Sequence, residues 1–345
     1  MITVGVIDDS PSIRRLMTRA LQADGDITVV GEAPDTVLGR AMLISAKPQV
    51  LTLDVTLPGE SGLDFLQRLM SDTPLPTIMV SSLTSQGADE TIEALANGAV
   101  GCLQKPQCKA DVSSFEATLR MMVRNASNFK VQQTRSFNRR QMKYSRENSK
   151  RIELIAVSAS TGGIKSTGFF LTSLPPNSPP IVITQHMQPA FLAQLANRMN
   201  DEHPFDVALG REGEVLSKGM VRIAPPGHHM LLDRSSLRIV TRLEKADKSE
   251  PIVPAADPML MSIAENIGGN VIAAVLSGMG KDGAKGMKAL KKLGAQCIGE
   301  SPETCVVYGM SKAAKNLGGI DKELPIQELG NHAAALMGYT RDLSA

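Results

Sequence analysis

The sequence predicts an α/β protein made of two sheet-containing domains joined by a polar linker. Apolar runs of strand length alternate with amphipathic helical patterns over residues 1–120, and again from about residue 151. The stretch between them is basic, polar and without periodicity. Such alternation is typical of parallel sheets with helices on both faces. We therefore expect domains at 1–120 and 151–345, with a basic flexible linker at 121–150.

Composition restricts the classes of function. The chain has 345 residues, 42% of them hydrophobic, and a formal net charge of only +2, which does not indicate a nucleic-acid-binding protein. Four cysteines without a CxxC pair favour a reducing compartment. No apolar run approaches the length of a membrane span, and MITVGVIDDS predicts a buried strand, not a signal peptide. We expect a cytoplasmic protein with no membrane insertion and no nucleic-acid partner.

The first domain should contain five strands that alternate with five helices. The strand patterns are ITVGVI, ITVVGE, QVLTLD, PTIMVSS and GCLQK. The helical patterns are SIRRLMTRALQA, TVLGRAMLISA, GLDFLQRLM, ADETIEALAN and DVSSFEATLRMMV. Because a helix separates each strand from the next, we expect one five-stranded parallel sheet.

Polar side chains stand where the strands of this domain end. Asp8 and Asp9 follow the first strand, and Asp54 ends the third. The carboxyl ends of parallel strands lie at one edge of the sheet, so these acids should converge. Carboxylates this close repel one another unless a cation joins them, and oxygen ligands suit Mg²⁺. Ser81 and Lys105, at the ends of the fourth and fifth strands, could hold a phosphoryl group at the same edge.

The motifs VIDDS, LDVTLPGESGLDFL, MVSSLT and the pair Lys105-Pro106 together resemble a response-regulator receiver domain. The resemblance implies a flavodoxin-like fold and phosphorylation of Asp54 by a histidine kinase. It also implies that Ser81 is the switching hydroxyl and that Lys105 pairs with the phosphoryl group. Cys102 stands where an aromatic switch residue is usual. The implied Mg²⁺ ligands are Asp9, Asp54 and the main-chain carbonyl of Thr56, with Asp8 acting through water.

The second domain shows the same alternation with one interruption. IELIAV, PPIVIT, NVIAAVLS and AQCIGE read as strands, each followed by a helix. Between Val207 and Arg242 the pattern changes to short strands with turns. We expect a doubly wound α/β sheet with a β-hairpin insertion.

The stretch AVSASTGG predicts a strand end, a sharp turn and a helix start. Such a turn can cradle phosphate or can present a serine nucleophile. Ser158-x-Ser160-x-Gly162 resembles a nucleophile elbow whose first glycine is replaced by serine. His186 follows the strand PPIVIT, and Asp282 follows the strand NVIAAVLS. Three strand ends could thus bring a nucleophile, a base and an acid together at one edge.

A rival interpretation uses the glycines around Asp282. Gly278-x-Gly280-x-x-Gly283 follows a strand and precedes a helix, and Glu300 lies 22 residues beyond Gly278, as in dinucleotide-binding sites. Asp282 would repel a pyrophosphate there. The spacing alone leaves open a serine hydrolase and a receiver-linked nucleotide-binding oxidoreductase. A DNA-binding response regulator that uses the basic linker is a further alternative.

Five motifs in order, SASTGG, ITQHM, APPGHHM, GMGKDGAKGM and VVYGMSKAA, resemble the catalytic domain of chemotaxis protein-glutamate methylesterases. The resemblance covers residues 152 to about 320, and an attached receiver is the usual architecture of that family. It implies that Ser160 is the nucleophile, His186 the base and Asp282 its partner. It further implies backbone N–H donors for the oxyanion, Met279 foremost, with Thr161 lining the site.

The resemblance implies phosphorylation-regulated hydrolysis of glutamate γ-methyl esters on chemoreceptor helices during chemotaxis adaptation. Deamidation of receptor glutamines is implied as a second reaction, and the esterase chemistry needs no cofactor. A chemotaxis histidine kinase would be the phosphodonor. The sequence departs from the family at Ser158, where glycine is usual. It also departs at residues 252–257, IVPAAD, where a His-Arg-Pro-Ser-Val-Asp run is usual: the basic residues are gone, while Asp257 is kept.

Overall fold

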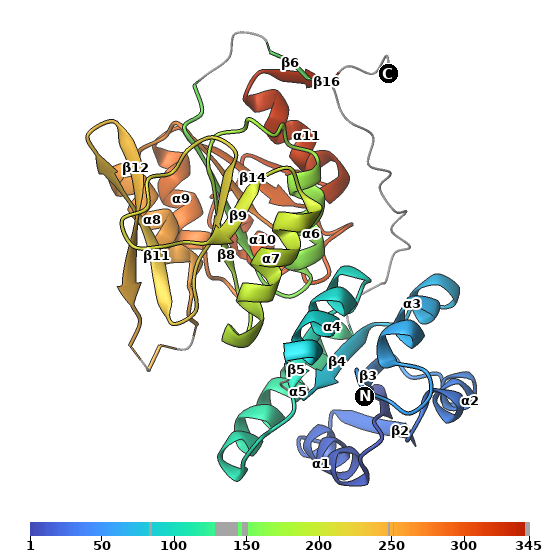
Figure 1. Cartoon of the computed structure of the whole chain (residues 1–345). Helices are drawn as coiled ribbons and strands as arrows, with labels where there is room; N and C mark the ends of the chain where they lie inside the picture. Colours follow the sequence, from blue (N-terminus) through green and yellow to red (C-terminus); the bar gives the residue numbers. More distant parts are fainter. Residues whose placement is uncertain (83–84, 128–143, 147–150, 248, 251, 342–345) are drawn as a thin grey trace. The chain divides into compact units, whose positions relative to one another are not determined.

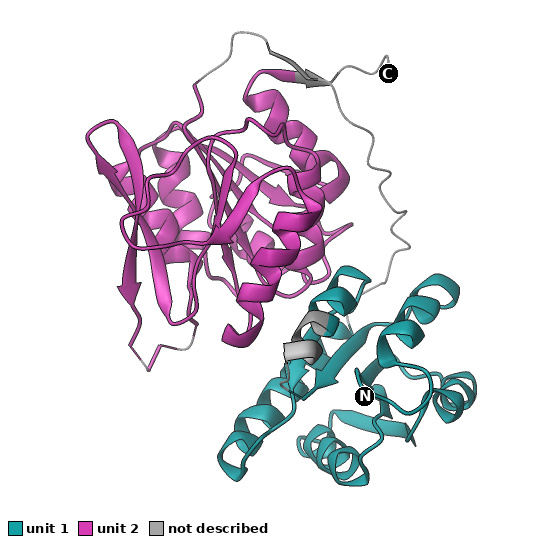
Figure 2. Cartoon of the chain, viewed as in Figure 1, with its two compact units in different colours: residues 1–135 teal, residues 136–345 magenta. Residues whose placement is uncertain are grey.

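The computed structural model divides into two compact units, Met1–Arg135 and Ser136–Ala345 (Figure 2). Most of the predicted linker lies outside the described residues. Within it, β6 (Tyr144–Arg146) pairs antiparallel with β16 (Tyr339–Arg341). The structure describes residues 1–82, 85–127, 144–146, 151–247, 249–250 and 252–341.

The first unit contains a five-stranded sheet with strand order β2-β1-β3-β4-β5, all parallel, which confirms the predicted fold (Figure 1). Helices cover both faces of this sheet, and its strands β3 and β4 are buried along their whole length. The elements are β1 (Ile2–Ile7), α1 (Pro11–Gln22), β2 (Ile27–Ala33), α2 (Thr36–Ala46), β3 (Val50–Asp54), α3 (Gly62–Asp72), β4 (Thr77–Ser81), α4 (Ser85–Ala96), β5 (Gly101–Gln104), the 3₁₀ turn η1 (Lys109–Asp111) and α5 (Val112–Ala126).

Helix α5 continues beyond residue 120, where we expected the first domain to end. Its buried side chains, Phe115, Leu119, Val123 and Ala126, keep a spacing of three or four residues. That apolar stripe faces the unit's core, so the helix gains burial by running to Ala126.

The second unit is built on a seven-stranded parallel sheet of order β15-β14-β13-β7-β8-β10-β9. The hairpin β11–β12 forms a separate two-stranded sheet. The elements are β7 (Leu154–Ala159), α6 (Gly163–Thr172), β8 (Ile181–Gln185), η2 (Pro189–Phe191), α7 (Leu192–Glu202), β9 (Asp206–Leu209), β10 (Met220–Ile223), β11 (His228–Ser235), β12 (Arg238–Lys245), α8 (Ala256–Asn266), β13 (Val271–Val275), α9 (Ala284–Lys292), β14 (Gln296–Glu300), α10 (Met310–Asn316), β15 (Lys322–Leu324) and α11 (Ile326–Leu336).

The region from Val207 to Arg242 is only partly a hairpin insertion. The hairpin itself is confirmed, but β9 and β10 belong to the main sheet and lie parallel to β8. Short strands at a sheet edge carry too few residues for their sequence pattern to reveal which neighbour they pair with.

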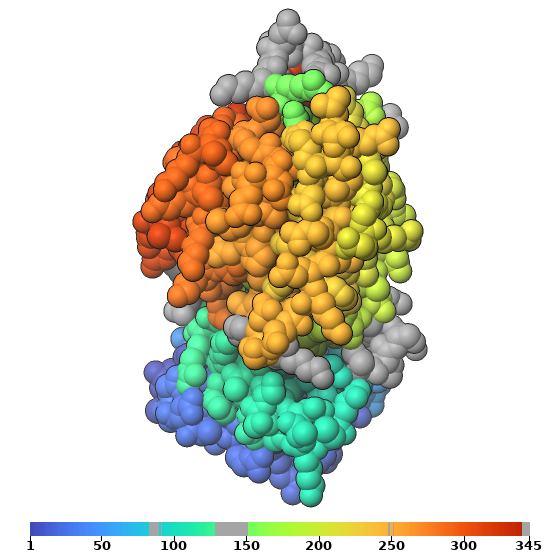
Figure 3. Space-filling model, turned by 90° about the vertical axis from the view of Figure 1, so that its left-hand side faces the viewer, coloured from blue at the N-terminus to red at the C-terminus, as the bar shows by residue number. Residues whose placement is uncertain are grey.

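The strand order of the second unit reverses between β7 and β13. Helices α6, α7 and α11 lie on one face of the sheet, and α8 and α9 with the hairpin lie on the other (Figure 1). Figure 3 shows the second face, where gold hairpin residues adjoin the orange residues of α8 and α9. The carboxyl ends of strands at such a reversal leave a crevice that open α/β sheets use for binding.

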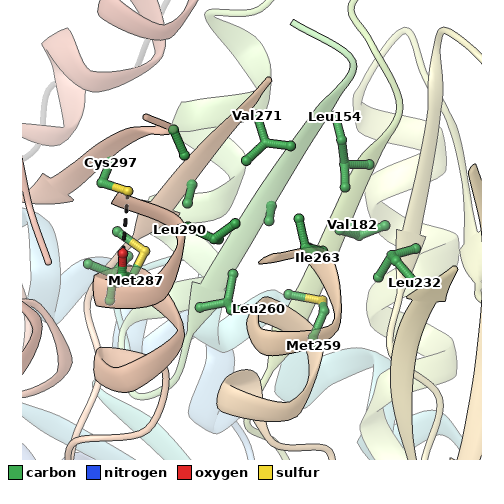
Figure 4. Close-up of a cluster of buried hydrophobic side chains, with 14 of the residues drawn as sticks. Leu154, Val182, Leu232, Met259, Leu260, Ile263, Val271, Met287, Leu290 and Cys297 are labelled. Atoms are coloured by element: carbon green, nitrogen blue, oxygen red, sulfur yellow. Dashed lines mark hydrogen bonds between the residues drawn. The ribbon is translucent and has the colours of Figure 1, made fainter. Parts of the chain in front are cut away.

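A hydrophobic core joins the sheet to α8 and α9 (Figure 4). Its side chains are buried, and burying one leucine or methionine stabilises the fold by roughly 2 kcal/mol. The core thus fixes the starts of both helices over the strand ends. The labelled members are Leu154, Val182, Leu232, Met259, Leu260, Ile263, Val271, Met287, Leu290 and Cys297.

In the parts of the chain that the structure describes, none of the helices combines the length and the apolar character needed to cross a membrane.

Candidate active site

The turn between β7 and α6 holds Ser160 in a fixed backbone position. The Ser160 amide donates to the Ser277 carbonyl at 3.0 Å, and the Gly163 amide donates to the Ser160 carbonyl at 2.8 Å. Gly162 has a φ of 77°, and a Cβ there would lie 2.3 Å from the Cβ of Val306. Both conformation and space therefore demand glycine at this point of the turn. The tight turn leaves Ser160 half-buried at the strand end.

His186 lies opposite Ser160 at the end of the neighbouring strand. Ala159 pairs in register with Gln185, and the His186 amide donates to the Ala159 carbonyl at 2.9 Å. The Gln185 side-chain amide donates to the Ser160 carbonyl at 2.9 Å, which ties the two strand ends together. His186 Nε2 lies 2.7 Å from Asp282 Oδ2, and these side chains are 13% and 10% exposed.

Asp282 is surrounded by hydrogen-bond donors. Its Oδ2 accepts from the Ala256 amide at 2.6 Å, and its Oδ1 accepts from the amides of Asp257 and Gly283, both at 2.9 Å. Burial alone would raise the pKa of Asp282, but the hydrogen bonds from His186 and these amides outweigh it and hold the pKa below its usual range. The carboxylate is therefore ionised at neutral pH and suited to fix the imidazole tautomer.

Backbone amides at the start of α6 are candidate oxyanion donors. Among the described residues, the amides of Thr161 and Gly162 donate to no acceptor, and both precede a helix N-terminus that favours negative charge. We expected the Met279 amide to donate to the oxyanion as well. A Cβ added to the preceding residue, Gly278, would lie 2.9 Å from the Cβ of Ser160. The turn that contains Met279 therefore lies against the serine.

Acidic side chains converge at the strand ends of the first unit as well. One carboxylate oxygen each from Asp8, Asp9 and Asp54 lies within 4.8 Å of the others. Lys105 Nζ bridges two of them, at 2.8 Å from Asp8 and 2.6 Å from Asp54. Burial raises the pKa of both Asp8 and Asp54, although Lys105 opposes the shift. A hard cation would relieve this crowding, so the carboxylate set fits Mg²⁺.

The other predicted receiver residues lie around this cluster. The Lys105 amide donates to the Ser81 carbonyl at 2.8 Å, and Ser81 is buried at the end of β4. The Thr56 amide donates to Asp54 Oδ1 at 3.3 Å, and its side chain is exposed. Cys102 is half-buried on β5. Burial would lower the pKa of Lys105, but its two carboxylate partners raise it, so the ammonium stays charged.

Both units match known families. Residues 155–333 match the family described as CheB methylesterase, and residues 4–114 match the response regulator receiver domain. A protein-glutamate methylesterase/protein-glutamine glutaminase of Anaeromyxobacter dehalogenans is 36% identical, with 98% of this chain and 95% of the relative covered. Another, from Pseudomonas aeruginosa, is 35% identical, with 97% and 96% covered. The chain belongs to the CheB methylesterase family.

A solved structure extends the family assignment to the fold. The CheB methylesterase catalytic domain of Thermotoga maritima is 36% identical, with a TM-score of 0.52 over 53% of this chain and 98% of that chain. The predicted enzyme class and the α/β fold are thereby confirmed. The output unit is a CheB methylesterase domain and not a helical DNA-binding module, which removes that alternative.

Glu300 decides against the dinucleotide alternative in this CheB-family chain. Its side chain is fully buried, and its Oε2 accepts from the Ser277 amide at 2.8 Å, so it cannot reach a ribose in a crevice. Gly280 and Gly283 instead serve the turn, with φ values of 88° and 84°. The motif thus reflects turn geometry and not nucleotide binding.

Ser277 is a supporting residue that the sequence did not reveal. Its hydroxyl donates to the Thr161 carbonyl at 2.8 Å, and its carbonyl accepts from the Ser160 amide. The Glu300 carboxyl accepts a hydrogen bond from the Ser277 amide, and burial raises the pKa of this carboxyl. The only signal in the sequence was a polar residue, Ser277, that ends an apolar strand pattern.

We expect Ser158→Ala to stabilise the second unit. The Ser158 hydroxyl is fully buried and has no hydrogen-bond partner among the described residues. An unsatisfied buried hydroxyl costs about 1–3 kcal/mol, so its removal should raise the free energy of unfolding by about 1 kcal/mol. Urea denaturation followed by circular dichroism would measure the change. A fall in stability would mean that the hydroxyl has a partner in solution.

We expect Mg²⁺ to stabilise the receiver unit. A ligand at 100 times its Kd stabilises the folded state by about 2.7 kcal/mol, which should shift the unit's thermal transition upward. Calorimetry in MgCl₂, against KCl of equal ionic strength, would measure the shift. Asp9→Asn removes one predicted ligand and should abolish it. An equal response of the variant and the unaltered chain would contradict the site.

Proposed function

We propose that this chain hydrolyses γ-glutamyl methyl esters on chemoreceptor helices and releases methanol. Deamidation of glutamine side chains on the same helices is the second reaction. The names of the relatives support both reactions, since they combine protein-glutamate methylesterase with protein-glutamine glutaminase. The observation that carries the proposal is the 2.7 Å contact between His186 and Asp282. His186 follows β8 beside the point where the neighbouring strand β7 leads into Ser160.

In the first half of the reaction, Ser160 Oγ attacks the ester carbonyl carbon. Asp282 engages His186 Nε2, which leaves Nδ1 to take the Ser160 proton. A tetrahedral intermediate forms and then collapses as the bond from the carbonyl carbon to the methoxy oxygen breaks. His186 returns the proton to that oxygen, and methanol leaves an acyl-serine behind.

In the second half, water attacks the acyl-serine carbonyl and loses a proton to His186. The bond to Ser160 Oγ then breaks, the serine regains the proton, and the glutamate side chain is released. Deamidation follows the same steps, with ammonia as the first leaving group. No step requires a metal or an organic cofactor.

Backbone donors would stabilise the oxyanion in both halves. The Thr161 amide, at the start of α6, is directed by the turn that also holds Ser160, and Met279 contributes from the facing turn. Each such donor contributes about 3–4 kcal/mol to transition-state stabilisation.

Phosphorylation of Asp54 would regulate the hydrolysis. A chemotaxis histidine kinase supplies the phosphoryl group to an Asp54 oxygen. Mg²⁺ would offset the negative charge there, held by Asp9, Asp54 and the Thr56 carbonyl, with Asp8 acting through water. Lys105, already 2.6 Å from Asp54, would pair with the phosphoryl oxygens, and Ser81 would donate its hydroxyl to them.

A methanol-release assay tests this function. Membranes that carry methylated chemoreceptors are incubated with the full-length chain, with and without a small-molecule phosphodonor and Mg²⁺. We expect methanol release that the phosphodonor accelerates in the unaltered chain and not in Asp54→Asn. The absence of methanol under all conditions would refute the esterase, and an equal response of Asp54→Asn would refute the regulation.

A further inference from the structure

Two neighbouring helices of the catalytic unit each have their first turn bound by an aspartate of the other. Asp282, just before α9, accepts the amides of Ala256 and Asp257 at the start of α8. In return, Asp257 Oδ1 accepts the amide of Gly286, in the first turn of α9, at 2.9 Å. We call this reciprocal pair, Asp257 and Asp282, the crossed caps. It satisfies amides that both helix starts would otherwise leave unpaired.

Close packing brings the two helix starts within reach of each other's aspartate. A Cβ on Gly286 would lie 2.3 Å from the Cβ of Leu260, and a Cβ on Gly283 would lie 3.3 Å from that of Ala256. The glycines thus let the backbone of α9 approach α8 closely. The starts of the two helices are therefore in direct contact.

The start of α8 is anchored independently of α9. The Ala255 amide donates to His229 Nδ1 at 3.0 Å, so His229 carries its proton on Nε2 and donates it to Glu250 Oε2 at 2.7 Å. His229 is buried on β11. The hairpin therefore provides a fixed reference for residues 255–257, to which the crossed caps attach α9.

Asp257 is half-buried, and both its burial and the charge of Asp282 raise the pKa of its carboxyl. The hydrogen bond from the Gly286 amide opposes this shift. The contact with Gly286 requires an oxygen acceptor and not a negative charge, so an uncharged amide side chain could accept the same bond.

We propose that Asp257 is a positioning residue for the ester hydrolysis proposed above, on which this inference rests. Asp257 holds the first turn of α9, and the carboxylate of Asp282 is attached to that turn through Gly283. It thereby keeps Asp282 Oδ2 aimed at His186 Nε2. Among the described residues, the imidazole of His186 is hydrogen-bonded to Asp282 and not to Asp257, so Asp257 would act on the imidazole through Asp282. A displacement of about 1 Å in a catalytic group can lower the rate by about 100-fold.

The first experiment compares kcat and KM for methanol release by full-length variants. Asp257→Ala removes the acceptor for the Gly286 amide and should lower kcat by about 10-fold or more, with KM within about twofold. Asp257→Asn keeps an oxygen acceptor and should recover most of the loss. Glu265→Ala, an exposed position on the same helix, is the matched control and should leave both constants unchanged.

A second readout does not depend on activity. Amide hydrogen exchange in the full chain should be faster at residue 256 in Asp257→Ala than in the unaltered chain, and unchanged in Asp257→Asn. If Asp257→Ala lowers the Tm but keeps kcat and this protection, Asp257 is only a helix cap and the proposal is wrong. Equal losses in the Ala and Asn variants would also overturn it.

The two readouts separate this proposal from the function on which it rests. If the unaltered chain releases no methanol, the proposed function fails, and the exchange rate at residue 256 then decides alone whether Asp257 organises the Asp282 contact. Unchanged protection in Asp257→Ala would overturn the inference in that case too.

Discussion

Ser160→Ala should abolish methanol release, with a fall in kcat of about 10⁶-fold, as expected when the nucleophile of a hydrolytic triad is lost. Ser158, the other serine at this strand end, cannot take over because its side chain is fully buried. The substitution removes one half-buried oxygen, so the fold and the receiver unit should be unaffected. Stopped assays on methylated receptors would measure the remaining rate.

Ser158→Ala is the matched control for this experiment. It removes the same atom two residues earlier in the same strand and turn, and we expect it to keep full activity. Phosphorylation of Asp54 should proceed equally in both variants, which would show that the receiver unit remains competent. Substantial methanol release by Ser160→Ala would refute the mechanism in which Ser160 is the nucleophile.

Asp282→Asn should reduce kcat by about 10⁴-fold, because an amide in place of the carboxylate favours the wrong imidazole tautomer and cannot stabilise the imidazolium. The same change affects stability. Asp282 accepts the Ala256 and Asp257 amides, and losing one hydrogen bond to a charged acceptor costs about 1.5–3 kcal/mol. Activity and the free energy of unfolding should therefore fall together, unlike in Ser160→Ala.

The stability effect of Asp282 should depend on pH. Its pKa in the folded state lies below the ordinary value of 3.8, so the stabilisation is fully present above that value and is lost as the pH falls through the folded-state pKa. The difference in unfolding free energy between the unaltered chain and Asp282→Asn should accordingly narrow in acid. A difference that stays constant from neutral pH to below 3.8 would contradict the ionised, hydrogen-bonded carboxylate.

Much of the architecture could be predicted from local patterns. Alternating strand and helix periodicity revealed both units and the parallel character of their sheets, since each strand that is buried on both faces must be apolar along its length. Residues at the carboxyl ends of such strands, Ser160, His186 and Asp54 among them, could be placed at a sheet edge from the order of elements alone. The positions of the edge strands β9 and β15 in the sheet could not be predicted in this way, because both strands are short.

The sequence by itself determined which chemical groups stand at the strand ends of this protein. The tertiary structure alone decided that Asp282 meets Nε2 of an imidazole 96 residues away, that Glu300 is buried beneath Ser277, and that Asp257 binds the start of α9. These contacts join residues distant in the chain, and the last of them depends on how closely α8 and α9 pack at Gly283 and Gly286. Periodicity reports the environment of one element at a time, so it carries no information about such contacts.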